Sequence, residues 1–158
     1  MNDHTPTRLS SLADAIATQI EQARGQLRQA VNSVMVQSYW EIGRLIVEDE
    51  QQGESRAEYG KQQLQQLSQQ LTERLGKGFD ITNLRKMRTF YQAFPIRDAL
   101  RSELSWTHYR LLMRVENDKA REFYMQEAVK SQWSTRQLER QINSFFYERL
   151  LSSKNKEQ

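Results

Sequence analysis

Cysteine is absent from the 158-residue chain, and histidine occurs only twice, as His4 and His108. A chain without cysteine has no disulfide scaffold, no thiolate ligand for a metal and no cysteine nucleophile. Two histidines are also too few for the histidine cages that hold catalytic zinc. We therefore expect neither a metal nor a cofactor.

Proline occurs twice and glycine six times, and no apolar run approaches the roughly 18 residues that cross a bilayer. The first residues lack the basic start and apolar core of a signal peptide, so we expect a cytoplasmic protein without a membrane partner. Glutamine, in contrast, occurs 19 times. Few turn residues and many helix-compatible ones indicate an all-α fold, and the length suits one structural domain.

The net charge of +3 conceals an uneven distribution of charged residues. Residues 1–58 hold five basic and nine acidic side chains, a net charge of −4, whereas residues 59–158 hold eighteen basic and eleven acidic ones, a net charge of +7. A basic segment suits an anionic partner, and nucleic acid is the commonest large one. The alternative is a solvated surface that is basic without a partner.

Apolar residues in the first segment alternate in spacing between three and four positions, which is the heptad pattern of a coiled-coil seam. These residues are Ala13, Ile16, Ile20, Ala23, Leu27, Ala30 and Val34. No proline interrupts residues 8–50, and Gly53 follows them, so residues 1–56 are expected to form one long helix or two nearly collinear ones. Such a helix is longer than a small domain. We therefore expect part of it to project and to hold a homodimer together.

A compact helical bundle is predicted over residues 57–151, beginning with two helices joined by a turn. The first covers about 57–75, and glycines at 76 and 78 end it. Its core stripe is Gly60, Leu64, Leu67, Leu71 and Leu75. The second begins near Thr82, or at Asp80 if the cap lies earlier, and stops before Pro95.

Three further helices are predicted from their caps at Ser105, at Asn117 or Asp118, and at Ser134, where Gln137 completes a capping box. The last of them is expected to continue inward through Leu138, Ile142, Phe145 and Leu150. Residues 152–158 are polar and are expected to form a frayed tail.

The strongest candidate site is the helix pair at 57–94, which resembles a helix-turn-helix with cations clustered on its second helix. Near the start of that helix, Thr82, Asn83 and Lys86 are candidates for contacts with base edges. Phosphate contacts are assigned to Lys77, Arg85 and Arg88. Any pair of amphipathic helices has this pattern, so the alternative is a hairpin without a DNA-binding role.

A second basic face is predicted on the last helix, where Arg136 and Arg140 lie one turn apart. Lys130 precedes this helix and Tyr147 extends the same side, so a phosphate-binding or stacking surface is conceivable. The alternative, a solvated face partly neutralised by Glu139, is the more common situation.

No enzyme motif is present in the sequence. A restriction-type nuclease core needs an Asp or Glu two positions before a lysine, and none of the seven lysines has one. The chain also has neither a phosphate-binding glycine loop nor a HExxH zinc motif. His108 lies beside Trp106 and Tyr109 without an evident catalytic partner, so we interpret it as a packing or hydrogen-bonding residue.

Several ordered blocks resemble the amino-terminal domain of the YhcG family, a domain of unknown function that precedes a PD-(D/E)XK nuclease domain. The resemblance covers about residues 10–155. The blocks are AVNS at 30–33, YWEIGR at 39–44, RAEYGK at 56–61, the residues Gly78, Phe79, Asn83, Leu84, Met87, Arg88, Phe90 and Tyr91, LSWTH at 104–108, AREFY at 120–124 and WSTRQLERQI at 133–142. More loosely, the order of these blocks is similar to the DNA-binding region of ParB-type partition proteins.

The resemblance implies a helical module that binds duplex DNA and targets a nuclease domain, in cis or in trans. The family's nuclease domain would follow near Gln158, so the sequence is expected to be either the front part of a nuclease or a stand-alone module. The alternative from another class is a protein-interaction and oligomerisation domain without nucleic-acid binding. A third, an enzyme in its own right, is disfavoured by the missing motifs.

Overall fold

The structure, a computed structural model, describes the backbone of residues 4–52 and 57–157 and the side chains of residues 7–52 and 62–154. Its helices in chain order are α1 (His4–Gln52), α2 (Ala57–Leu75), α3 (Ile81–Ala93), the short 3-10 helix η1 (Arg97–Ala99), α4 (Trp106–Leu112), α5 (Asp118–Lys130), α6 (Thr135–Asn143) and α7 (Phe146–Glu157). These described ranges contain no strand, which confirms the all-α fold. None of the described helices is long and apolar enough to cross a membrane.

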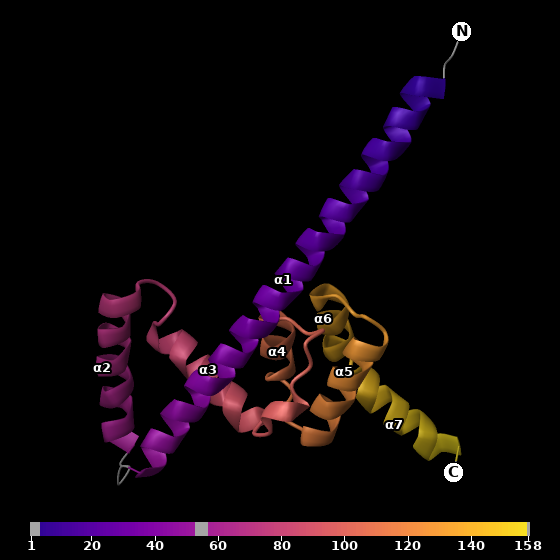
Figure 1. Cartoon of the computed structure of the whole chain (residues 1–158). Coiled ribbons are helices and arrows are strands. Elements are labelled where there is room, and N and C mark those ends of the chain that lie inside the picture. The colour runs from indigo at the N-terminus through magenta and orange to yellow at the C-terminus, as the bar shows by residue number, and fades with distance from the viewer. Residues whose placement is uncertain (1–3, 53–56, 158) are drawn as a thin grey trace.

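The first helix is one continuous helix of 49 residues, so it is about 74 Å long. We call its residues 4–34 the arm, because they project from the rest of the molecule (Figure 1). The first buried residue among the described side chains of α1 is Val36, which is 3% exposed. The remainder of α1 and the helices α2–α7 form the body. Gly53, the predicted end of the first helix, lies outside the described residues.

The body is assembled around the crossing of α1 and α3. A small apolar cluster joins α1, α2 and α3 through Ile46, Leu64, Leu84 and Met87. A larger cluster joins α1 and α3 to α4, α5 and α6. The Trp40 indole N–H donates a 2.7 Å hydrogen bond to the carbonyl of Phe94, so the second half of α1 is tied to the end of α3. The arm is therefore a rigid continuation of a core helix.

Gly43 lies where α1 and α3 approach most closely. A Cβ atom added to this glycine would lie 2.1 Å from the carbonyl oxygen of Met87 and 3.0 Å from Cβ of Tyr91. Glycine lowers helix stability relative to alanine, so its presence within α1 is explained by this contact.

The predicted helix caps agree with the structure. Asp80, Ser105, Asn117 and Ser134 cap α3, α4, α5 and α6, and the capping box with Gln137 is present. These caps form because each side-chain oxygen accepts a hydrogen bond from a backbone N–H that the first turn leaves free.

The environment of His108 confirms its interpretation as a hydrogen-bonding residue. Its Nδ1 is 3.1 Å from the backbone nitrogen of Ser105 and its Nε2 is 2.9 Å from the carbonyl oxygen of Trp133. The side chain therefore links the start of α4 to the segment before α6.

The end of the chain differs from the prediction. The sixth helix stops at Asn143, because Phe145 adopts a positive φ of 56°. Phe145 is 63% exposed and Leu150 is 40% exposed, so neither points inward as expected. The break lets Phe146 and Tyr147 at the start of α7 pack on Phe123 of α5. The segment expected to fray is helical as far as Glu157.

The stripe of α2 is also shorter than predicted. Leu64 is buried and Leu67 and Leu71 pack beside it, but Leu75 is 64% exposed because the last turn of α2 extends past its neighbours. The burial of Gly60, the first residue of the predicted stripe, lies outside what the structure describes.

Tyr109 is fully buried, and burial raises the pKa of its phenol to about 12. The contribution of Tyr109 to the free energy of unfolding should therefore be constant below pH 10, where tyrosine is neutral in both states, and should fall as the pH rises from 10 to 12. The expected loss is up to about 3 kcal/mol. Urea titrations at pH 8, 10 and 11.5 measure it. Tyr109→Phe should be less sensitive over this interval, and an equal sensitivity would contradict the assignment.

Candidate nucleic-acid interface

The start of α3 is fixed by the turn that precedes it. Gly76 and Gly78 have positive φ values of 90° and 109°, which side chains disfavour. Asp80 accepts a 2.9 Å hydrogen bond from the backbone N–H of Asn83, and Ser68 Oγ donates a 2.7 Å hydrogen bond to the carbonyl of Phe79. These contacts hold the predicted hairpin of α2 and α3, although α3 packs mainly on α1.

A groove with a basic lining runs between α3 and α4. We call it the basic groove; its volume is about 470 Å³ and it is lined by Thr82, Arg85, Lys86, Thr89, Arg110, Met113 and Arg114. The lining residues on α3 are separated by three, one and three positions in the sequence. Those on α4 and the turn that follows it are separated by three positions and one position. Each set therefore lies on one face of its helix. The aromatic contact between Phe90 and Tyr109, at 5.0 Å between ring centroids, holds the two helices together beneath the groove.

The lining carries four cations and two hydroxyl groups, and it includes no carboxylate. An adjoining hollow shares Arg110 and Arg114 with the groove and adds Arg136 and Glu139 to the same surface. Arg114 and Glu139 are 3.6 Å apart and both side chains are at least half exposed, so this ion pair is weak. The surface is therefore positively charged from α3 to the start of α6.

The structure brings together four of the predicted site residues and separates the others. Thr82, Arg85 and Lys86 line the basic groove, and Arg136 lies in the adjoining hollow. Arg88, in contrast, points to the other side of α3, where its guanidinium is 2.9 Å from the carboxylate of Glu50 on α1. Its predicted role as a phosphate ligand conflicts with this placement.

The remaining predicted residues lie outside the groove. The Asn83 side chain donates a 3.3 Å hydrogen bond to the carbonyl of Gly78, so it already serves the turn. Lys77 lies exposed in that turn, and Arg140 lies exposed on α6, one turn beyond Arg136. Tyr147 is not a stacking platform, because its ring packs 5.0 Å from that of Phe123.

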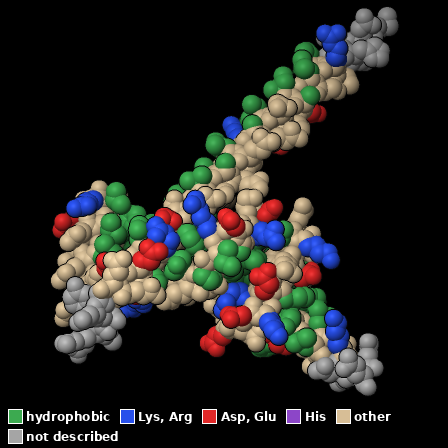
Figure 2. Space-filling model, turned by 60° about the horizontal axis from the view of Figure 1, so that its bottom comes forward, with side chains coloured by type: hydrophobic (Ala, Val, Ile, Leu, Met, Phe, Trp, Pro, Cys, Tyr) green, Lys and Arg blue, Asp and Glu red, His purple; other side chains and the backbone are tan. Residues whose placement is uncertain are grey.

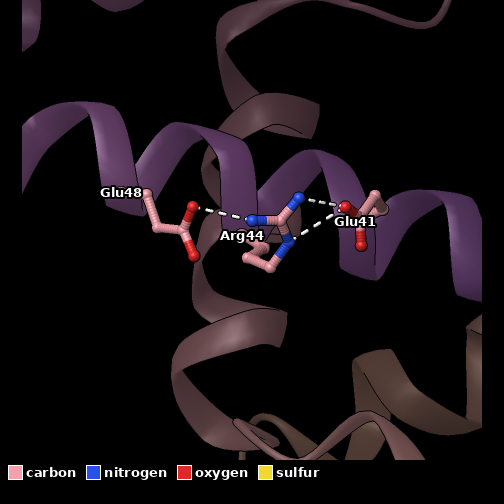
Figure 3. A network of polar contacts seen from close by, with 3 residues as sticks. All are labelled: Glu41, Arg44 and Glu48. Carbon is pink, nitrogen blue, oxygen red and sulfur yellow. Dashed lines mark hydrogen bonds and ion pairs between the residues drawn. The ribbon is translucent and has the colours of Figure 1, made fainter.

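Acidic residues of α1 neutralise cations near them. Arg44 donates hydrogen bonds to Glu41 and Glu48, 2.9 Å and 2.7 Å away, as Figure 3 shows. Glu41 and Arg44 pair at positions i and i+3, one turn apart on the same helix. The guanidinium lowers the pKa of the Glu41 carboxyl, and the two carboxylates raise the pKa of Arg44. This face of α1 is therefore a poor site for phosphates.

Arg110 and Arg114 are groove residues that the sequence did not reveal as part of a site. They are four positions apart, and counting from the predicted cap at Ser105 puts Arg110 in the last turn of its helix. That spacing was a usable signal. What the sequence lacks is the packing of α4 against α3, which alone brings the two sets of cations together.

Single replacements should separate a structural arginine from a binding one. Arg88→Ala removes a partly buried ion pair, so we expect a loss of about 1 kcal/mol in unfolding free energy and unchanged nucleic-acid affinity. Arg85→Ala is expected to do the opposite, because Arg85 is exposed in the groove. Thermal unfolding and fluorescence anisotropy with a labelled duplex measure the two effects. The reverse pattern would move the interface to the Arg88 face.

No group of three or more His, Cys, Asp or Glu residues suited to a metal occurs among the residues that the structure describes. The polar groups that line the basic groove are therefore cations and hydroxyls, which bind phosphate oxygens.

Comparisons with known proteins place this chain in a family. Residues 15–149 match the sequence profile of the family described as "DUF1016 N-terminal domain". The chain is 36% identical over 188 aligned residues to the Escherichia coli (strain K12) protein named "Putative nuclease YhcG", covering 99% of the chain and 50% of that protein. The chain therefore spans about half the length of this curated relative. No solved structure matches it.

Proposed function

Because this chain belongs to the family of DUF1016 N-terminal domains, as its resemblance to the YhcG family predicted, we propose that it binds duplex DNA and positions a nuclease domain. The chain itself contributes no catalysis in this proposal. The nuclease domain acts in cis or in trans, in keeping with the name of the relative and with the half of its length that the chain spans.

The basic groove is the observation that carries this proposal. Four cations from two helices converge on it with two threonine hydroxyls and no carboxylate. Arginine forks and lysine point charges bind phosphate oxygens, and neutralising several phosphates releases the counterions that drive non-specific affinity. The acidic residues of α1 would repel a DNA duplex. They therefore favour the orientation of the body in which the basic groove faces the DNA.

In this proposal, residues in the first turn of α3 recognise the base sequence of the DNA. Thr82 is exposed at that turn and lines the groove, so it can reach a base edge in the major groove. Asn83 can do so only after giving up its hydrogen bond to Gly78. Lys77 flanks this turn, and Arg136 and Arg140 extend the phosphate contacts along α6.

The arm supplies the dimer contact in this proposal. Its seam residues are exposed along a helix that the body does not cover; for example, Ile16 is 55% and Leu27 is 65% exposed. Figure 2 shows hydrophobic side chains along one side of the arm. Two copies would carry two basic grooves, which suits the two half-sites of a DNA target.

A second candidate function is a protein-interaction domain that binds no nucleic acid. The observation in its favour is a mostly apolar groove of about 340 Å³ between α1 and α2, lined by Leu45, Ile46, Asp49, Glu50, Gln63, Leu64 and Leu67. Leu45 is 55% exposed there, so an apolar side chain of a partner could cover it. Stable oligomers without salt-dependent DNA binding would favour this candidate.

An electrophoretic mobility shift assay with duplex DNA tests the proposed function. We expect a shifted complex at 50 mM salt and a loss of affinity of at least tenfold at 200 mM, because contacts to several phosphates make binding steeply salt-dependent. A control with single-stranded DNA of the same sequence shows whether the duplex is preferred. Failure to bind any duplex at low salt would contradict the proposal.

A further inference from the structure

The seam of the arm is longer than three heptads. Leu9 precedes Ala13 by four positions, so the alternation of three and four runs unbroken through eight positions from Leu9 to Val34. The large residues among them are 48–65% exposed. A helix with such a stripe buries it against another helix, because apolar area removed from water contributes about 25 cal/mol per Å².

The body does not obstruct this seam. The α1 residues that face the body include Val36, Trp40 and Gly43. At 100° per residue they lie about half a turn around the helix from Leu27 and Val34. A second helix can therefore lie along the whole seam, even where the body begins.

Charges along the seam, from Leu9 to Val34, are arranged by sign and by flank. Asp14 and Glu21 lie in the first half of the seam, whereas Arg24 and Arg28 lie in its second half, and Arg8 precedes it. In heptad terms all four occupy the same flank of the seam, at positions e and b. The opposite flank carries Gln19 and Gln26 and has no charge near them.

This arrangement distinguishes the two possible orientations of a paired arm. In a parallel pair the charged flank lies beside the partner's glutamine flank, so no opposite charges meet. In an antiparallel pair the charged flanks of both helices meet in reversed order. In the register given below, Arg24 lies within two positions of the second copy's Glu21 and Arg28 within one position of its Asp14, so these four charges have opposite neighbours.

We propose that the arms of two copies pair antiparallel, with residue n of one copy opposite residue 43 minus n of the other. This register overlaps all eight seam positions. Leu9 lies opposite Val34, Ala13 opposite Ala30, Ile16 opposite Leu27, and Ile20 opposite Ala23. The two bodies then lie at opposite ends of the paired arms. The inference deepens the proposed homodimer and rests on it, but it does not depend on DNA binding.

Disulfide trapping tests the orientation directly, because the chain has no cysteine of its own. Ala13→Cys and Ala30→Cys are made as separate full-length proteins, one with a size tag, and oxidised alone and mixed. Antiparallel pairing predicts a cross-linked product of mixed size in most of the mixture and little product from either protein alone. Both alanines are exposed on the arm, so the body should fold unchanged, which circular dichroism verifies.

The outcomes are distinguishable from those of the proposed function. Cross-linking of each variant with itself, and not with the other, would show a parallel dimer and overturn the antiparallel inference while leaving the dimer intact. A monomeric mass for the wild-type chain in light scattering would overturn both the pairing and the dimer, while the mobility shift assay still reports DNA binding. Small-angle scattering of the wild type gives a second measurement, since antiparallel pairing places the bodies at the two ends of an elongated particle.

Discussion

Replacing Gly43 by alanine is expected to destabilise the chain by at least about 3 kcal/mol. The added Cβ would lie 2.1 Å from the carbonyl oxygen of Met87, and backbone atoms of a packed helix cannot move aside as a flexible side chain can. The helices α1 and α3 would have to separate, which opens both apolar clusters of the body. We expect the Tm to fall by about 10 °C, measured by circular dichroism.

Gly25→Ala is the matched control for this change. It lies in the same helix, but no atom lies within 4 Å of a Cβ added there. Alanine favours the helix over glycine by about 1 kcal/mol, so helicity should stay equal or rise. If both variants had the same Tm, the close approach of α1 and α3 at Gly43 would be wrong.

The combined replacement of Arg85, Lys86, Arg110 and Arg114 by alanine should lower the affinity for duplex DNA by at least about 100-fold at 100 mM salt. The four side chains are the cations of the basic groove, and the core does not depend on them because Arg85, Arg110 and Arg114 are exposed and Lys86 is half-buried. Secondary structure and Tm should therefore be retained. Fluorescence anisotropy of a labelled duplex measures the loss.

A control variant removes the same charge elsewhere, at the exposed residues Arg74, Arg101, Lys119 and Lys154. These four do not line the basic groove. A modest, general loss of affinity is expected from the reduced net charge. Equal losses in both variants would mean that binding follows net charge and not the groove.

Features that depend on neighbouring residues in the chain were predictable from the sequence. The caps at Ser105 and Ser134 and the glycine stop at Gly76 follow from hydrogen bonds or backbone angles within one turn. The length of α1 follows from the absence of proline between residues 8 and 50. Each of these features depends on residues that are close together in the chain, so it can be recognised from one sequence alone.

Features that depend on packing between distant segments were not predictable. Arg88 was grouped with Arg85 and Lys86 because they are neighbours in sequence, yet its partner Glu50 is 38 residues away. Arg110 belongs to the site only because α4 packs beside α3. The break at Phe145 arises because Phe146 and Tyr147 pack on α5, which overrides local helix propensity.

The salt dependence of duplex binding, compared between the wild type and the groove variant, tests the central claim most directly. The logarithm of the binding constant falls linearly with the logarithm of the salt concentration. The magnitude of that negative slope decreases by about 0.9 for each phosphate contact removed. If the four groove cations contact phosphates, the wild-type slope should be steeper than that of the groove variant by about 3 to 4, and the control variant should keep the wild-type slope. Equal slopes for the wild type and the groove variant would contradict the assignment of the basic groove as the DNA-binding surface.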